Sequence, residues 1–174
     1  MLYLLSLGSN IAPEQHTPLA VAQLLQRYHS LFWYPGVYTE ACLVESDRRF
    51  INALCWLCAD ESPEHLKQQL CLIESQLGRD RTDPYRSIKD RSCDIDILWS
   101  GTELQPDWAE LLTEPYLVQV LTPDSVKAQL WYGAELLPQS PAAIYFQAET
   151  GDKWVIDQKT DAFENWLKAR LSGN

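Results

Sequence analysis

The stretch RFINALCWLCADESPEHLKQQLCLIESQLG, residues 49–78, contains both kinds of element from which the fold is built. Residues 49–58 are mostly apolar and rich in β-forming side chains, which predicts a buried strand. Ser62 and Pro63 are residue types preferred at the N-cap and the first position of a helix. The predicted buried face of that helix repeats at helical spacing: Leu66, Leu70, Ile73 and Leu77. Gly78 then supplies the helix stop.

A strand and a helix also precede this unit. Residues 2–7, LYLLSL, predict a central strand that is broken at 8–10, GSN. Thr17 and Pro18 predict the N-cap and first position of a helix that runs through residue 29. Its predicted apolar face consists of Leu19, Ala22, Leu25 and Tyr28.

Two further strands complete the core. Residues 31–40 are strand-like but contain Pro35–Gly36, which predicts a bend or bulge, and they should pair with 49–58. Residues 92–99 predict a fourth strand. The order β-α-β-β-α-β is that of an α+β, ferredoxin-like core.

The last third of the chain is less regular. Residues 107–112 predict a short helix, and 142–157 predict a hairpin that turns at Thr150–Gly151. Residues 160–171 predict a terminal amphipathic helix. Its predicted apolar face consists of Phe163, Trp166, Leu167 and Leu171. We expect one domain over 1–174, with a core of about 1–125 and an extension of about 126–174.

The charge of the chain limits its partners. The formal net charge is −10 and the sequence pI is about 4.6. General nucleic-acid binders show a basic face, and anionic membranes attract basic segments, so both partners are disfavoured. The first ten residues lack the basic segment of a signal peptide, and no later apolar run is long enough to span a bilayer.

Five cysteines, an odd number without regular spacing, predict reduced thiols and a cytoplasmic location. Cys55 and Cys58 form a C-x-x-C, but strand alternation aims their thiols at opposite faces. No second pair of Cys or His completes a zinc site. Both are therefore predicted to be buried small residues.

The fourth predicted strand carries two carboxylates, in RSCDIDILWS, residues 91–100. Alternation places Asp94 and Asp96 on one face, with Cys93, Ile95 and Ile97 on the other. Carboxylates that close repel unless one takes up a proton or a cation lies between them. Magnesium suits such a pair because it binds one or two carboxylates together with waters and phosphates. The alternative is a solvent-exposed strand face, where acids repel only weakly.

Basic residues gather just before this strand. Five of the 14 Lys and Arg lie within thirteen positions: Arg79, Arg81, Arg86, Lys89 and Arg91. Arginine binds phosphate oxygens through paired hydrogen bonds, so the loop predicts a phosphate ligand beside the carboxylates. The alternative is a solvated surface loop, because Asp80, Asp83 and Asp90 are interleaved with the basic residues.

Four segments, taken in order, resemble the 6-hydroxymethyl-7,8-dihydropterin pyrophosphokinases of the folate pathway. They are LGSN (7–10), FINA (50–53), IESQLGRDR (73–81) and RSCDIDIL (91–98). The resemblance covers roughly residues 2–123, and the ordered set is more specific than any single motif. That family has a ferredoxin-like core, as the order of elements independently predicts.

In that family, ATP donates its terminal pyrophosphoryl group to the hydroxymethyl oxygen of the pterin, and AMP leaves. The resemblance implies ATP as co-substrate and two Mg²⁺ ions held by Asp94 and Asp96. The implied catalytic residues are Arg79, Arg81, Arg91, Asp94 and Asp96. The implied pterin-binding residues are Phe50, Asn52 and Asp94. The implied ATP-binding residues are Arg81, Arg91, Ile97, Thr113 and Tyr116.

Structural interpretations of several of these residues remain open. Gly8 and Asn10 can simply shape a turn, and Phe50 can be an ordinary core residue. Asn52 lies in an apolar strand and needs hydrogen-bond partners if it is buried, which a ligand could supply. Glu74 is interpreted as a surface residue on the polar side of its helix.

The chain also departs from the family pattern. The loop TDPYRSIKDRSCD (82–94) lacks the usual Trp-Gly-Pro, for which Tyr85 is the candidate replacement, and TEACLV (39–44) replaces a Thr-Pro-Pro pterin loop. Tyr116 stands where the family has a histidine, and no arginine occurs between Arg91 and Arg170. Lys127 is the nearest cation that could compensate.

These departures leave two functions to be weighed. The first is an active pterin pyrophosphokinase with a divergent nucleotide side. The second is a catalytically impaired relative that acts as a pterin-binding or regulatory module. The oligomeric state is not predicted.

Overall fold

The computed structural model describes residues 1–42, 46–85, 88–146, 154–157 and 162–172. Six antiparallel strands form one sheet in the order β4-β1-β3-β2-β7-β8. Their bounds are Leu2–Ser9 (β1), Ser30–Thr39 (β2), Phe50–Cys58 (β3), Asp94–Gly101 (β4), Ala142–Phe146 (β7) and Trp154–Asp157 (β8). With α1 (Pro13–Tyr28) and α2 (Pro63–Gln76), the first four strands confirm the predicted β-α-β-β-α-β order.

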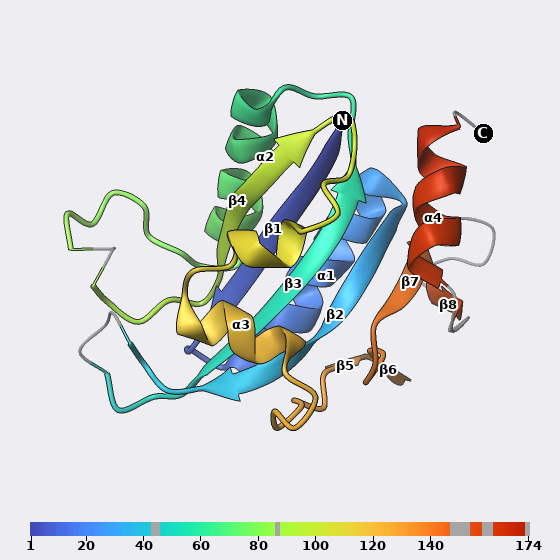
Figure 1. Cartoon of the computed structure of the whole chain (residues 1–174). Coiled ribbons are helices and arrows are strands. Elements are labelled where there is room, and N and C mark those ends of the chain that lie inside the picture. The colour runs from blue at the N-terminus through green and yellow to red at the C-terminus, as the bar shows by residue number, and fades with distance from the viewer. Residues whose placement is uncertain (43–45, 86–87, 147–153, 158–161, 173–174) are drawn as a thin grey trace.

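The two faces of the sheet carry separate hydrophobic cores. Figure 1 shows α1 and α2 together on one face, where they pack on alternate residues such as Leu5, Leu7 and Ile51. The other face is covered by η1 (Trp108–Leu111), α3 (Pro115–Leu121) and α4 (Ala162–Leu171). Cys55 belongs to the first core and Cys58 packs against the second, so their thiols lie on opposite faces, as alternation predicted.

Helix α2 begins and ends where the sequence indicates. The Ser62 side chain accepts a hydrogen bond from the His65 N–H, and Pro63 occupies the first helical position, where no N–H is needed. Gly78 follows the helix with a φ of 88°, a left-handed conformation that glycine adopts without steric cost. The four predicted apolar positions are all buried.

The predicted start of α1 is wrong. The helix begins at Pro13, and both Thr17 and Pro18 are buried inside it. Pro13 suits the first position because its missing N–H would have had no helical partner, whereas Pro18 leaves one helical bond unmade. Leu19, predicted on the buried face, is 40% exposed. It lies about 200° around the helix from Val21, which is buried in the core between the helix and the sheet.

The bend predicted at Pro35–Gly36 is present. The pairing of β2 with β3 shifts register between Tyr34 and Val37. A Cβ at Gly36 would lie 2.9 Å from Ile51 Cγ2, so only glycine allows the strands to approach this closely.

The C-terminal extension continues the sheet and covers its second face. β7 pairs with β2 and β8 pairs with β7, which confirms the predicted hairpin; its turn at Thr150–Gly151 lies outside the described residues. On α4, Trp166 is buried against Phe32 and donates to Ser30 Oγ at 3.2 Å. Leu171, predicted on the apolar face, is 50% exposed because it belongs to the last turn of the helix.

Three elements were not predicted as such. The short helix expected over 107–112 is the 3-10 helix η1, while α3 and the small β5–β6 hairpin (Trp131–Tyr132 and Glu135–Leu136) were missed. These elements are too short for a periodic pattern to be recognised. α3 nevertheless matters for the site, because it places Tyr116 over the sheet.

Candidate active site at the Asp94–Asp96 strand

Asp94 and Asp96 lie on the same face of β4, the strand at one edge of the sheet. Ile95, between them, is buried on the opposite face in the core beneath α1 and α2. Both carboxylates line a cavity of about 120 Å³. The predicted alternation of side chains along this strand is therefore present.

The floor of the cavity comes from three neighbouring strands. Gly8 of β1 is paired with Asp94 of β4 on one side and with Asn52 of β3 on the other. A Cβ at Gly8 would lie 3.0 Å from Asn52 Oδ1, so the glycine leaves room between the carboxylate and the amide. The interpretation of Gly8 as a turn residue is wrong, because it lies within the regular pairing of β1 with both neighbours.

Phe50 and Asn52 of β3 line the cavity beside this glycine. Asn52 is nearly buried, and its Nδ2 donates to Thr39 Oγ1 at 2.7 Å. That bond leaves the Asn52 oxygen directed over Gly8. Phe50 is 8% exposed and lies under the Arg91 guanidinium, 5.8 Å from the ring centroid.

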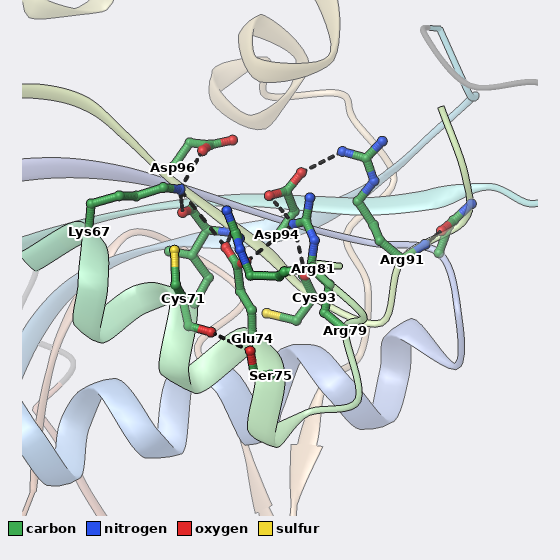
Figure 2. Close-up of polar contacts among 12 residues, drawn as sticks. Lys67, Cys71, Glu74, Ser75, Arg79, Arg81, Arg91, Cys93, Asp94 and Asp96 are labelled. Atoms are coloured by element: carbon green, nitrogen blue, oxygen red, sulfur yellow. Dashed lines mark hydrogen bonds and ion pairs between the residues drawn. The ribbon is translucent and has the colours of Figure 1, made fainter. Parts of the chain in front are cut away.

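Two arginines hold Asp94. Arg79 Nη1 contacts one carboxylate oxygen and Arg91 Nη1 contacts the other. Burial alone would raise the pKa of Asp94, but hydrogen bonds and charge from Arg79 and Arg91 hold that pKa below its usual value. Figure 2 shows both guanidinium groups directed toward this carboxylate. Asp94 is therefore ionised over the whole neutral range.

Asn10 fixes the position of the Arg91 backbone. Its Oδ1 accepts the Arg91 N–H at 2.7 Å, its own N–H donates to the Arg91 carbonyl at 3.0 Å, and its Nδ2 donates to Asp90 at 2.6 Å. The end of β1 is thereby tied to the start of β4. Asn10 acts as a connector between these segments and not only as a turn residue.

Asp96 is held differently, by a lysine of α2. Lys67 Nζ donates to Asp96 Oδ1 and to the Ile95 carbonyl, both at 2.7 Å. The Asp96 side chain is 56% exposed and that of Lys67 is 35% exposed. Sequence reasoning did not identify Lys67, and only the packing of α2 against β4 shows it.

Glu74 is fully buried under the two aspartates, so its interpretation as a surface residue is wrong. Its Oε1 accepts the Ile95 N–H at 2.8 Å, and its Oε2 contacts the Arg81 guanidinium and lies 3.5 Å from that of Arg79. Burial raises the pKa of Glu74, against the opposing effects of the Ile95 N–H and Arg79. Its position four residues after Leu70 is the spacing of the buried face, a signal that was overlooked.

Residues 4–124 match the family model of 7,8-dihydro-6-hydroxymethylpterin-pyrophosphokinase (HPPK). This match covers more than half of the chain. The chain belongs to the HPPK family. No curated protein matched the chain in a search. The members of this family are pterin pyrophosphokinases of folate biosynthesis, so the recognition made from the four ordered segments is confirmed.

The other residues that the HPPK resemblance named do not all line the cavity. Tyr116 of α3 lines it, and burial raises the pKa of its hydroxyl. Ile97 packs against the core on the α1–α2 face of the sheet, and Thr113 is exposed outside the cavity lining. Arg81 contacts Glu74 and does not line the cavity. Their roles in binding ATP stay predictions.

The compensating residues suggested by the sequence do not reach the cavity. Lys127 Nζ donates to the Thr122 carbonyl at 3.2 Å, and Tyr85 is 62% exposed beneath Lys89. Arg86 lies outside the described residues. Glu40 and Cys42 do line the cavity, in the segment where the family has its pterin loop.

The donor set fits magnesium. Among the described residues, no cluster of three or more His, Cys, Asp or Glu could hold a metal ion. Mg²⁺ does not need such a cluster, because it binds one or two carboxylates and completes its shell with waters and phosphate oxygens. Asp94 and Asp96 supply two carboxylates on one cavity wall.

Among the helices described, none is long and apolar enough to cross a membrane.

Proposed function

We propose that this HPPK family member transfers pyrophosphate from ATP to 6-hydroxymethyl-7,8-dihydropterin, with two Mg²⁺ ions, and releases AMP. The row Asp94–Gly8–Asn52 across three paired strands carries the proposal. Neighbouring strands are about 4.8 Å apart, so roughly 10 Å separates the Cα atoms of Asp94 and Asn52. A flat pterin ring between them would have its polar edge at Asn52 and its hydroxymethyl group toward the carboxylates.

The pterin side of the proposed site uses Phe50 and Asn52, together with Asp94. Phe50 offers an aromatic face to the ring, and the Asn52 oxygen, directed over Gly8, offers an acceptor to ring N–H groups. The Asn52 amide is held by Thr39, so its oxygen is positioned before the substrate binds. The near burial of Asn52 excludes water that would compete for this acceptor.

The phosphate side uses Arg79, Arg81 and Arg91, with Asp94 and Asp96 as metal ligands. Bound Mg²⁺ would neutralise charge on the phosphates and orient them. The proposed ATP contacts also include Ile97, Thr113 and Tyr116. In the transfer, the hydroxymethyl oxygen forms a bond to the β-phosphorus, the bond from the β-phosphorus to the oxygen of AMP breaks, and the hydroxyl proton passes to solvent water. We infer that Arg91, which lines the cavity, and Arg79, which contacts Asp94 from outside the cavity lining, stabilise the charge that develops.

The test is an assay of AMP release from ATP with hydroxymethyl-dihydropterin, in the presence and absence of Mg²⁺. We expect Mg-dependent turnover that is nearly abolished in Asp96→Ala. Glu164→Gln, at an exposed position on α4, is the matched control that removes a carboxylate outside the site. Folded protein that releases no AMP above background would overturn the proposal.

A second candidate function is an impaired relative that binds pterin or regulates another protein. One observation favours it: α3 contributes Tyr116 to the cavity but carries no Lys or Arg, so one side of the phosphate chain lacks the expected cations. A charge-assisted hydrogen bond is worth about 1.5–3 kcal/mol, so losing two would weaken ATP binding by orders of magnitude. Calorimetric titration with a non-hydrolysable ATP analogue plus Mg²⁺, with and without pterin, separates the two functions. Pterin binding without any ATP binding would support this candidate, and measurable turnover would exclude it.

The organisation of the chain also stays a proposal. We propose one domain over 1–174, in which the core to about residue 125 carries the site and residues from about 126 extend the sheet and cover it. A cytoplasmic location remains a prediction from the cysteine content.

A further inference from the structure

Lys67 is a cation of the site that the resemblance to the HPPK family did not name. Its side chain extends from α2 past the edge of β4, and its Nζ lies 2.7 Å from Asp96 Oδ1 (Figure 2). The same ammonium donates to the Ile95 carbonyl at 2.7 Å and lies 4.0 Å from Glu74 Oε1. Lys67 thus donates a hydrogen bond to a carboxylate oxygen that is proposed to bind the metal ion.

Part of this arrangement has a structural explanation. β4 is an edge strand, and the outward N–H and C=O of Ile95 need partners. Glu74 accepts from that N–H and Lys67 donates to that C=O. The bond from Lys67 to Asp96 is not needed to cap the edge, so this second contact requires another account.

The charges around the carboxylates supply that account. Among the described side chains, four cations contact three carboxylates: Lys67, Arg79, Arg81 and Arg91 against Glu74, Asp94 and Asp96. The carboxylate pair is therefore already neutralised without a metal ion. A divalent cation at Asp96 would repel the Lys67 ammonium, which is only 2.7 Å from the same oxygen.

We propose that Lys67 is a displaceable counter-ion of Asp96. When a divalent cation binds Asp96 Oδ1, the Lys67 ammonium moves away from that oxygen and donates a hydrogen bond to the phosphate chain of the nucleotide. This inference rests on the proposed function. It gives the phosphate chain a cation from α2 in place of those absent from α3.

The distance that the ammonium must move is short. Magnesium–oxygen distances are about 2.0–2.1 Å, so two adjacent oxygens on one ion lie about 3 Å apart. Because Lys67 Nζ lies 2.7 Å from Asp96 Oδ1, a phosphate oxygen that shares an ion with that carboxylate oxygen would lie within about 6 Å of the ammonium. The four-carbon stem of lysine allows such a shift without movement of the helix.

The test compares Lys67→Met with wild type and with Lys168→Met. Methionine keeps an apolar stem and removes the charge. Lys168 is an exposed lysine of α4 paired with Glu164, and serves as the matched control. The first measurement is the affinity for Mn²⁺ without nucleotide, determined from the electron paramagnetic resonance signal of the free ion. The second is the affinity for α,β-methylene-ATP in Mg²⁺, by calorimetry. Thermal unfolding of each variant monitors the fold.

We expect Lys67→Met to bind Mn²⁺ about 3- to 10-fold more tightly than wild type, because a partly exposed ion pair no longer competes for Asp96. We expect its affinity for the ATP analogue to fall about 10-fold or more, because a charge-assisted hydrogen bond is lost. Lys168→Met should change neither value. Only the opposite directions of the two effects distinguish a displaceable counter-ion from an ordinary edge cap.

An Mn²⁺ affinity equal to or weaker than that of wild type would overturn the inference, including the case in which neither protein binds Mn²⁺. A lower unfolding temperature with unchanged metal and nucleotide affinities would assign Lys67 to edge capping alone, and would also overturn it. If wild type binds no nucleotide or pterin, the proposed function fails. The Mn²⁺ comparison then still decides whether Lys67 competes with a cation for Asp96.

Discussion

Glu74→Gln tests whether one buried carboxylate holds the basic side of the site together. Glutamine keeps the size of the side chain and an oxygen acceptor for the Ile95 N–H, which Glu74 accepts at 2.8 Å. It removes the negative charge that Arg79, Arg81 and Lys67 share. The substitution therefore isolates the charge from the packing.

The expected loss of stability follows from what each cation can do afterwards. Removing one partner of a buried ion pair costs about 3–5 kcal/mol. Arg81 and Lys67 are about one-third exposed and can turn to water, which discounts their share. Arg79 is 9% exposed but keeps its contact with Asp94. The burial that raises the pKa of Glu74 offsets part of this cost, because the buried charge is itself unfavourable. The glutamine NH2, however, would face the guanidinium donors of Arg79 and Arg81. We expect a net loss of roughly 2 kcal/mol, which corresponds to about 4–8 °C in the unfolding temperature of a chain of this size.

The assay is urea unfolding at neutral pH, with the slope m compared between variants to show that the transition remains the same. Glu164→Gln, at an exposed i,i+4 pair on α4, is the control and should stay within about 0.5 kcal/mol of wild type. If Glu74→Gln has the same midpoint as wild type, the negative charge of Glu74 does not hold the three cations. The burial that raises its pKa would then be its main energetic effect.

Three further predictions follow from the same contacts. Because the Asp94 pKa lies below its usual value, ionised Asp94 adds stability that is present above about pH 4 and is lost as the pH falls through the lowered pKa. Asp94→Asn should therefore be less stable than wild type at pH 7 and should lose less unfolding free energy between pH 5 and pH 2. Equal losses for the two proteins in urea unfolding over this pH range would contradict the prediction. Gly8→Ala places a methyl group 3.0 Å from Asn52 Oδ1 and should weaken pterin binding about tenfold, a loss of about 1.4 kcal/mol. The control Ser6→Ala, in the same cavity, should leave pterin binding unchanged. If calorimetry gives Gly8→Ala and wild type the same pterin affinity, the proposed pterin position is wrong. Trp166→Ala should cost about 3–5 kcal/mol because Trp166 is 1% exposed, and a loss under about 1 kcal/mol would show that α4 contributes little.

Several elements were predictable because local chemistry alone determines them. Ser62, Pro63 and Gly78 mark the ends of α2 through capping and backbone conformation, whatever the helix packs against. Asp94 and Asp96 share a face because strand side chains alternate. The start of α1 was mispredicted because Thr17–Pro18 has the same local pattern as a true helix start, and Pro13 offers a competing local signal five residues earlier.

The sequence by itself determined the α+β order, the aspartate pair and the resemblance that the HPPK family match confirms, since each depends on neighbouring residues or on an ordered set of motifs. Only the tertiary structure decided that Glu74 is buried, that Lys67 occupies Asp96, and that Asp94 and Asn52 face each other across Gly8. Helix periodicity shows which residues share a face, but it does not show which carboxylate that face meets. The β4 partners of Lys67 and Glu74 lie 29 and 21 residues away in the chain, and the pairing of β4 with β1 and the packing of α2 bring them together.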